Sequence, residues 1–138
     1  MTDESIEYLS TEACWQKLKE APFGRIAMAV AGVVEIFPIN FIESGGALYF
    51  RTAPGTKLLA LTVNSDVAIE VDSYTADEAW SVVVRGVAER VEKQSEIDIA
   101  ETLALHPWMP TLKYRWVRVR PTQLTGRQFH RDPEPERF

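Results

Sequence analysis

Cysteine and histidine are scarce in this sequence, and their scarcity narrows the chemistry open to it. The 138 residues include a single cysteine, Cys14, and two histidines, His106 and His130. A lone cysteine cannot form an internal disulfide and is typical of a protein of the reducing cytoplasm. The histidines lack partners at metal-ligand spacing, so no metal site is predicted. They also give no basis for a Ser-His-Asp arrangement.

Long apolar runs are missing as well. The longest, around residues 26–34, is interrupted by Gly32 and is far too short to cross a bilayer. No basic segment followed by an apolar one opens the chain, so a secretory signal is not expected. The net charge of −5 argues against nonspecific nucleic-acid binding as the main task. We therefore expect one cytoplasmic domain over residues 1–138, with neither a membrane nor a nucleic acid as its partner.

Apolar residues first recur at helical spacing and then at strand spacing. Ser10 or Thr11 caps a predicted helix that buries Cys14, and Pro22 follows it. Beyond it, a period of two predicts strands at 25–30, 33–42, 47–52, 66–73, 79–92 and 114–120. Short helices are predicted at 54–63 and from the cap Ser95 to Leu105, and residues 1–9 and 130–138 are expected to be loose. The prediction is a mainly β (α+β) fold, a closed six-stranded antiparallel barrel with small flanking helices, because a flat sheet would leave long edges.

Two strands carry irregularities. Pro38 cannot donate to a ladder, so its strand should be an edge or contain a bulge or a bend. In the last predicted strand the apolar residues switch from even to odd numbers between Trp116 and Val117. That switch predicts a β-bulge at this point, which would keep both apolar pairs facing inward.

The stretch from Tyr49 to Lys57 reads YFRTAPGTK and has the chemistry of an anion site. A strand ends in Arg51, and Pro54 then opens a predicted helix. The free N–H groups of a helix start attract phosphate, and arginine and lysine add charge beside it. Neither a Walker loop nor a dinucleotide fingerprint is present. Six basic residues and no acidic ones follow between Lys113 and Arg131, and they form either a solvated strand face or the lining for an anionic ligand.

Several segments, taken in order, resemble the pyridoxamine 5′-phosphate oxidase-like proteins, which are flavin-binding split β-barrels. The segments are 23–27 (FGRIA), 33–41 (VVEIFPINF), 48–52 (LYFRT), 55–58 (GTKL), 80–88 (WSVVVRGVA), 118–121 (RVRP) and 125–127 (TGR). Their order and spacing carry the resemblance, which covers roughly residues 9–129. The chain is most similar to the short family members of unassigned substrate.

This resemblance implies a homodimer with two flavin mononucleotides (FMN) bound between its subunits. It places Pro38, Ile39 and Asn40 along the flavin ring, and Phe50, Arg51 and Thr52 near the ring edge and the ribityl chain. Thr56 and Lys57 match the family's phosphate-binding pair, and Trp80 and Ser81 match a segment that reaches the cofactor from the second subunit. No catalytic side chain is identified.

The C-terminal arginine-histidine signature of the vitamin B6 oxidase is absent from residues 118–127, so oxidation of vitamin B6 is not expected. The implied function is an FMN-dependent oxidoreductase that transfers hydride to or from a small organic substrate, with NAD(P)H or another reductant as its partner. Two alternatives stay open. One is a reductase that uses the deazaflavin F420, whose anionic tail the basic residues from Lys113 onward could hold. The other is a carrier or sensor that binds flavin or haem without turnover.

Overall fold

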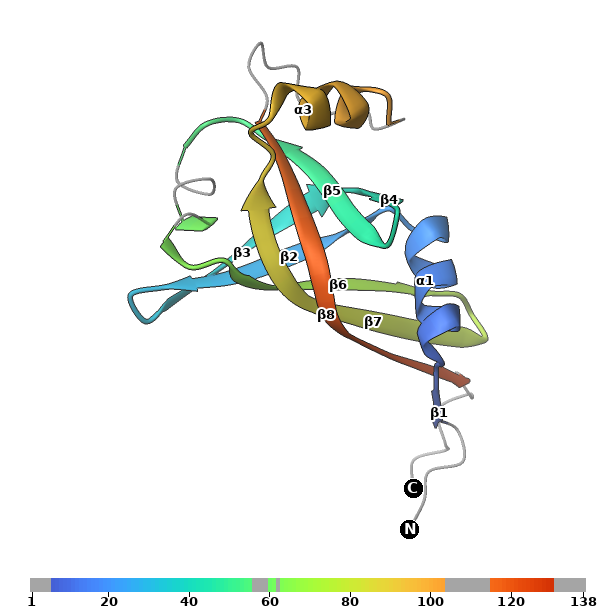
Figure 1. Ribbon diagram of the computed structural model, residues 1–138. Helices are drawn as coiled ribbons and strands as arrows, with labels where there is room; N and C mark the ends of the chain where they lie inside the picture. Colours follow the sequence, from blue (N-terminus) through green and yellow to red (C-terminus); the bar gives the residue numbers. More distant parts are fainter. Residues whose placement is uncertain (1–5, 56–59, 62, 104–114, 131–138) are drawn as a thin grey trace, which may run out of the picture.

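Antiparallel strands make up most of the structure, a computed structural model that describes residues 6–55, 60–61, 63–103 and 115–130 (Figure 1). The elements, in chain order, are β1 (Ile6–Tyr8), α1 (Thr11–Glu20), β2 (Phe23–Val30), β3 (Val33–Asn40), β4 (Ile42–Ser44), β5 (Ala47–Thr52), β6 (Asp66–Tyr74), β7 (Glu78–Arg90), α3 (Gln94–Glu101) and β8 (Arg115–His130).

The strands form one strongly curled sheet. Hydrogen-bonded neighbours follow the order β3-β2-β6-β7-β8-β5-β4, and β1 pairs with β8. Strands β3 and β5 stand far apart in this order, yet they contact each other across the curled sheet. The line along which β3 and β5 meet is called the seam below. This arrangement confirms the predicted split β-barrel, with more strands than the six that were expected.

Local sequence explains the first helix and the first hairpin. Ser10 caps α1, because its side chain accepts a hydrogen bond from the backbone N–H of Ala13 at 3.1 Å. The tight turn between β2 and β3 places Ala31 and Gly32 at φ 51° and φ 80°. Positive φ at both turn residues matches the twist of the paired strands, which explains why a glycine stands there.

Strand β8 corrects the prediction that the last strand ends at Arg120. It continues to His130 and pairs with β7 over almost its whole length. The register between β7 and β8 shifts at Arg85/Gly86, opposite Pro121. Because proline has no N–H to donate, a bulge is a place where a strand tolerates it. A Cβ on Gly86 would lie 2.5 Å from the carbonyl oxygen of Arg120, so the close approach of β7 and β8 at this point needs glycine.

The predicted bulge at Trp116-Val117 is wrong, since the pairing of β5 with β8 runs through these residues without a shift. Both faces of β8 are covered here, so consecutive residues are buried. Val117 points into the main core, whereas Trp116 belongs to a second cluster with Val91 and Ala100 that lies beneath α3. Helix α3 begins at Gln94, so the predicted cap Ser95 lies inside it, and it ends at Glu101 before the predicted limit Leu105.

The main core fills the barrel and seats α1 against it. Cys14 is fully buried, as predicted, and burial raises the pKa of its thiol. Its Sγ would lie 2.7 Å from a Cβ placed on Gly126 of β8, so helix and strand are in close contact. Among the described residues, neither helix has the length and apolar character needed to cross a membrane.

Candidate functional site

One margin of the seam is strand β3, which carries the predicted ring-binding segment. Strand β3 ends the hydrogen-bonded order, which confirms that the strand containing Pro38 is an edge. Pro38 is exposed and stands opposite Arg25, and Asn40 is half-buried opposite Phe23. Ile39, between them, is 4% exposed and faces the core. Because side chains alternate along a strand, a flat ligand on the outer side meets Pro38 and Asn40, whereas Ile39 offers it only backbone groups.

The other margin is strand β5, where the same alternation separates the three predicted residues. Phe50 is 1% exposed and Thr52 is 8% exposed, and both face the core. Arg51 points to the opposite side, with its guanidinium carbon 4.9 Å from the centroid of the Trp116 ring. Its Nη1 also lies 4.0 Å from Oε2 of Glu101 on α3. The Arg51 side chain is therefore held beneath α3, and Phe50 can present only its backbone to a ligand.

The strand-to-helix junction after Thr52 is open. Pro54 and Gly55 are exposed and form a bend, which corrects the prediction that the helix begins at Pro54. None of the described residues lies within 4 Å of a Cβ placed on Gly55, so a ligand could approach the backbone there. Thr56 and Lys57, the predicted phosphate-binding pair, lie outside the described residues.

Trp80 and Ser81 lie at the start of β7, away from the end of β5. Trp80 pairs with Gln128 near one end of β8, whereas Arg51 pairs with Trp116 near the other end. The Nζ of Lys17, on α1, is 5.3 Å from the centroid of the Trp80 ring. Within one chain, these two residues are therefore not brought to the junction at Thr52.

A charged cluster that the sequence did not reveal lies on the outer side of the sheet. Nη1 of Arg25 donates hydrogen bonds to Oε1 of Glu70 at 2.9 Å and to Oδ2 of Asp72 at 3.2 Å. Burial, with the hydrogen bond to and the negative charge of Asp72, raises the pKa of Glu70 to about 7, although Arg25 acts to lower it. Arg25 pairs with Pro38, and Asp72 pairs with Ser81, so the cluster stands between two predicted ligand segments. The carboxyl group of Glu70 can therefore hold a proton near neutral pH.

Two arginines of the basic run on β8 are paired with carboxylates of neighbouring elements. Arg118 and Arg120 both donate from Nε to Oε1 of Glu89, at 2.6 Å and 2.5 Å. Burial acts to raise the pKa of Glu89, but these hydrogen bonds and charges outweigh it and lower the pKa. Arg118 is also 3.8 Å from a carboxylate oxygen of Glu96 on α3. These two arginines therefore hold β8 against β7 and α3.

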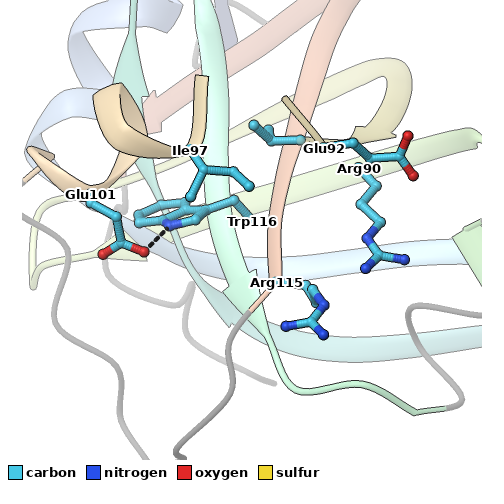
Figure 2. Close-up of a pocket in the computed structure, with 7 residues that line it drawn as sticks. Arg90, Glu92, Ile97, Glu101, Arg115 and Trp116 are labelled. Carbon is cyan, nitrogen blue, oxygen red and sulfur yellow. Dashed lines mark hydrogen bonds between the residues drawn. The ribbon is translucent and has the colours of Figure 1, made fainter. Parts of the chain in front are cut away.

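A pocket of about 430 Å³ lies where β7 ends, β8 begins and α3 crosses them. Arg90, Glu92 and Arg115 line it together with Ile97 and Trp116 (Figure 2). Glu101 lines it as well, but Oε1 of Glu101 accepts a hydrogen bond from Nε1 of Trp116 at 2.9 Å. The sequence marked Arg115 only as one member of a basic run and gave no sign of Arg90.

A family model described as pyridoxamine 5′-phosphate oxidase matches residues 10–128. The chain belongs to this family. A crystal structure of a candidate pyridoxamine 5′-phosphate oxidase from Corynebacterium glutamicum is 44% identical, with a TM-score of 0.85, over 91% of this chain and 98% of that one. The FAD binding protein from Mycobacterium smegmatis is 42% identical, with a TM-score of 0.76, over 89% of this chain and 97% of that one.

An uncharacterized protein of Mycobacterium tuberculosis is 41% identical over 93 residues, which are 67% of this chain and 84% of the relative. The predicted ligand segments of this family member lie at two places in the fold. These are the seam between β3 and β5 and the junction after Thr52.

Proposed function

We propose that this member of the pyridoxamine 5′-phosphate oxidase family is a flavin-dependent oxidoreductase that binds FMN, or the same portion of a larger flavin, at the seam. The observation that carries the proposal is the position of the two predicted ring segments. Residues 38–40 and 50–52 lie on the two strands that meet at the seam, although they are far apart in the hydrogen-bonded order. The 42% identity to the FAD binding protein of Mycobacterium smegmatis supports a flavin as the ligand.

The described residues fit such a cofactor. Pro38 and Asn40 present an edge strand to the ring, and the open backbone at Gly55 suits a phosphate. A bound flavin would supply hydride chemistry, and the protein would supply position and electrostatics. Glu70 pairs with Arg25, which in turn pairs with Pro38, and its carboxyl group would hold a proton near neutral pH. Lys57 would add positive charge at the phosphate.

A homodimer is part of the proposal, because the outer side of the sheet exposes large apolar side chains. We call the outward-facing residues of β2, β3, β6 and β7 the outer face; it includes Ala27, Val34, Ile36, Ala68 and Ser81. Val34 is 65% exposed and Ile36 is 62% exposed. The hairpin that carries them extends away from the barrel (Figure 1). Exposed apolar side chains that are grouped in this way are typical of an interaction site.

A second copy would also complete the site. Trp80 and Ser81 do not reach the junction of their own chain, so the predicted contact of these residues with the cofactor requires the partner subunit. We propose that the outer faces of two chains meet, and that each chain contributes its β7 start to the flavin on the other. A small organic molecule is the proposed substrate, and NAD(P)H is the proposed reductant.

Absorbance spectroscopy tests the proposal directly. Protein stripped of ligand is titrated with FMN, FAD, F420 or haemin, and the complexes are then mixed with NADH or NADPH without oxygen. Saturable flavin binding, followed by bleaching and by repeated turnover with an electron acceptor, is the expected result. Flavin binding without turnover would replace the enzyme with a carrier or sensor. Failure to bind any flavin would refute the proposed function.

A further inference from the structure

Arg51 of β5 lies between the seam and a buried tryptophan. Among the described residues, β4 pairs with β5 only over Ala47–Tyr49, so residues 50–52 have β8 on one side and the seam on the other. Arg51 pairs with Trp116 of β8, and its guanidinium carbon lies 4.9 Å from the centroid of the Trp116 ring. The ring therefore supports the guanidinium from the side opposite the seam.

Glu101 of α3 contacts both members of this pair. Its Oε1 accepts a hydrogen bond from Nε1 of Trp116 at 2.9 Å (Figure 2), and its Oε2 lies 4.0 Å from Nη1 of Arg51. Trp116 is 2% exposed and its indole has a single N–H, so this hydrogen bond satisfies a buried donor and fixes the orientation of the ring. The ion pair with Arg51 is the weaker contact, because the Glu101 side chain is 54% exposed.

The place of Glu101 in α3 is unfavourable for the helix alone. Glu101 is the last residue of α3, whose last turn contains no basic residue. The partial negative charge at a helix C-terminus disfavours a carboxylate there, so contacts with the sheet explain a glutamate at this position. Glu96, nearer the start of α3, lies 3.8 Å from Arg118 and gives the helix a second attachment to β8 that does not involve Arg51.

We propose that Glu101 is a positioning residue for the flavin site: through its hydrogen bond to Trp116 it keeps the Arg51 guanidinium in the orientation that contacts the cofactor. The inference rests on the proposed function, because it requires a flavin at the seam in contact with Arg51. A guanidinium that is already stacked loses less conformational freedom when a ligand binds. Glu101 itself need not touch the ligand.

Titrations that follow flavin fluorescence on binding of FMN test the inference on the full chain. Ordering one flexible side chain on binding weakens affinity by about 2- to 12-fold, so Glu101→Ala should weaken FMN binding by about fivefold. Glu101→Gln should bind FMN within about twofold of the unaltered protein, since an amide oxygen can still accept from Trp116. Trp116→Phe keeps a ring but cannot donate, and it should weaken FMN binding by the same factor as Glu101→Ala.

A double-mutant cycle shows whether Glu101 acts through Arg51. Arg51→Gln should weaken FMN binding by itself, because it removes a charged donor from the ligand. Glu101→Ala should then have no further effect in the Arg51→Gln background, since no guanidinium is left to position. A purely structural role of Glu101 would give the same loss in both backgrounds.

Glu96→Ala is the matched control, because it removes a carboxylate of α3 that contacts Arg118 and not Trp116 or Arg51. It should leave FMN affinity unchanged, and the thermal midpoint of each variant reports whether the fold is kept. Tighter FMN binding by Glu101→Ala would overturn the inference, since Glu101 would then hold Arg51 away from the ligand. An unchanged affinity in Glu101→Ala or Arg51→Gln would overturn it too, as would an equal loss in Glu101→Gln or Glu96→Ala. Absence of flavin binding by the unaltered protein would instead refute the proposed function itself.

Discussion

Ile36→Lys is the sharpest test of the proposed dimer, because it places a charge among the exposed apolar side chains of the outer face. Ile36 is 62% exposed in the single chain. Full burial of such a side chain contributes about 1.5–3 kcal/mol, so covering its exposed part would contribute roughly 1–2 kcal/mol. A two-fold interface counts this contribution twice, about 2–4 kcal/mol in all. The variant should therefore raise the dimer dissociation constant by about 30- to 700-fold, before any cost of burying the ammonium group.

Sedimentation velocity over a range of concentrations measures this shift, and circular dichroism shows whether the variant is folded. The matched control is Ile99→Lys, which makes the same exchange on α3 at a residue that is 67% exposed and outside the outer face. We expect the control to sediment like the unaltered protein. If Ile36→Lys forms dimers as strong as those of Ile99→Lys, the assignment of the outer face as the interface is incorrect.

Three further predictions concern pH, packing and the phosphate. Because the pKa of Glu70 is about 7 in the folded state and 4.5 ordinarily, stability should fall as pH rises between these values. Glu70→Gln should remove this fall, which is about 1 kcal/mol after solvent screening. Urea unfolding at pH 5 and pH 8 measures it, and an equal pH dependence in the unaltered protein and the variant would contradict the shift. Gly86→Ala should cost about 1–3 kcal/mol of unfolding free energy, because its Cβ would meet backbone at 2.5 Å, while Gly55→Ala, with open space, should be nearly neutral. Lys57→Ala should weaken FMN binding by roughly 1.5–3 kcal/mol, and an unchanged affinity on titration would exclude Lys57 from the site.

The barrel could be predicted from the sequence because most strands alternate apolar and polar residues. The prediction missed the second half of β8, where the outward residues are polar and Pro121 and Gly126 are typical of turns. Pairing with β7 overrides these local preferences, because a bulge opposite Gly86 accommodates the proline. The false bulge at Trp116 had a different cause. The prediction assumed that only one face of the strand is buried. Helix α3 covers the other face as well, and the spacing of apolar residues along the sequence does not reveal that contact.

For the candidate site, residues close together in sequence were found and those joined by tertiary register were not. The segments 38–40 and 50–52 were visible because each is continuous and matches a family pattern. The cluster of Arg25, Glu70 and Asp72 depends on how β2 pairs with β6, 45 residues along the chain. A single sequence does not specify that pairing. The pocket of Arg90 and Arg115 likewise needs the ends of three elements to be placed together.

Strand β8 also determines when this protein can fold during its synthesis. Strands β2, β3, β6 and β7 form a connected half of the sheet, but the hairpin of β4 and β5 joins that half only through β8. The ribosome makes β8 after every strand that it connects, so the hydrogen bonds that join the two halves form only when residues 115–130 have emerged. Until then the edges of β5 and β7 are unpaired, and unpaired edges are the usual starting points of aggregation. The interval between the synthesis of β7 and that of β8 is therefore when these two strand edges are exposed.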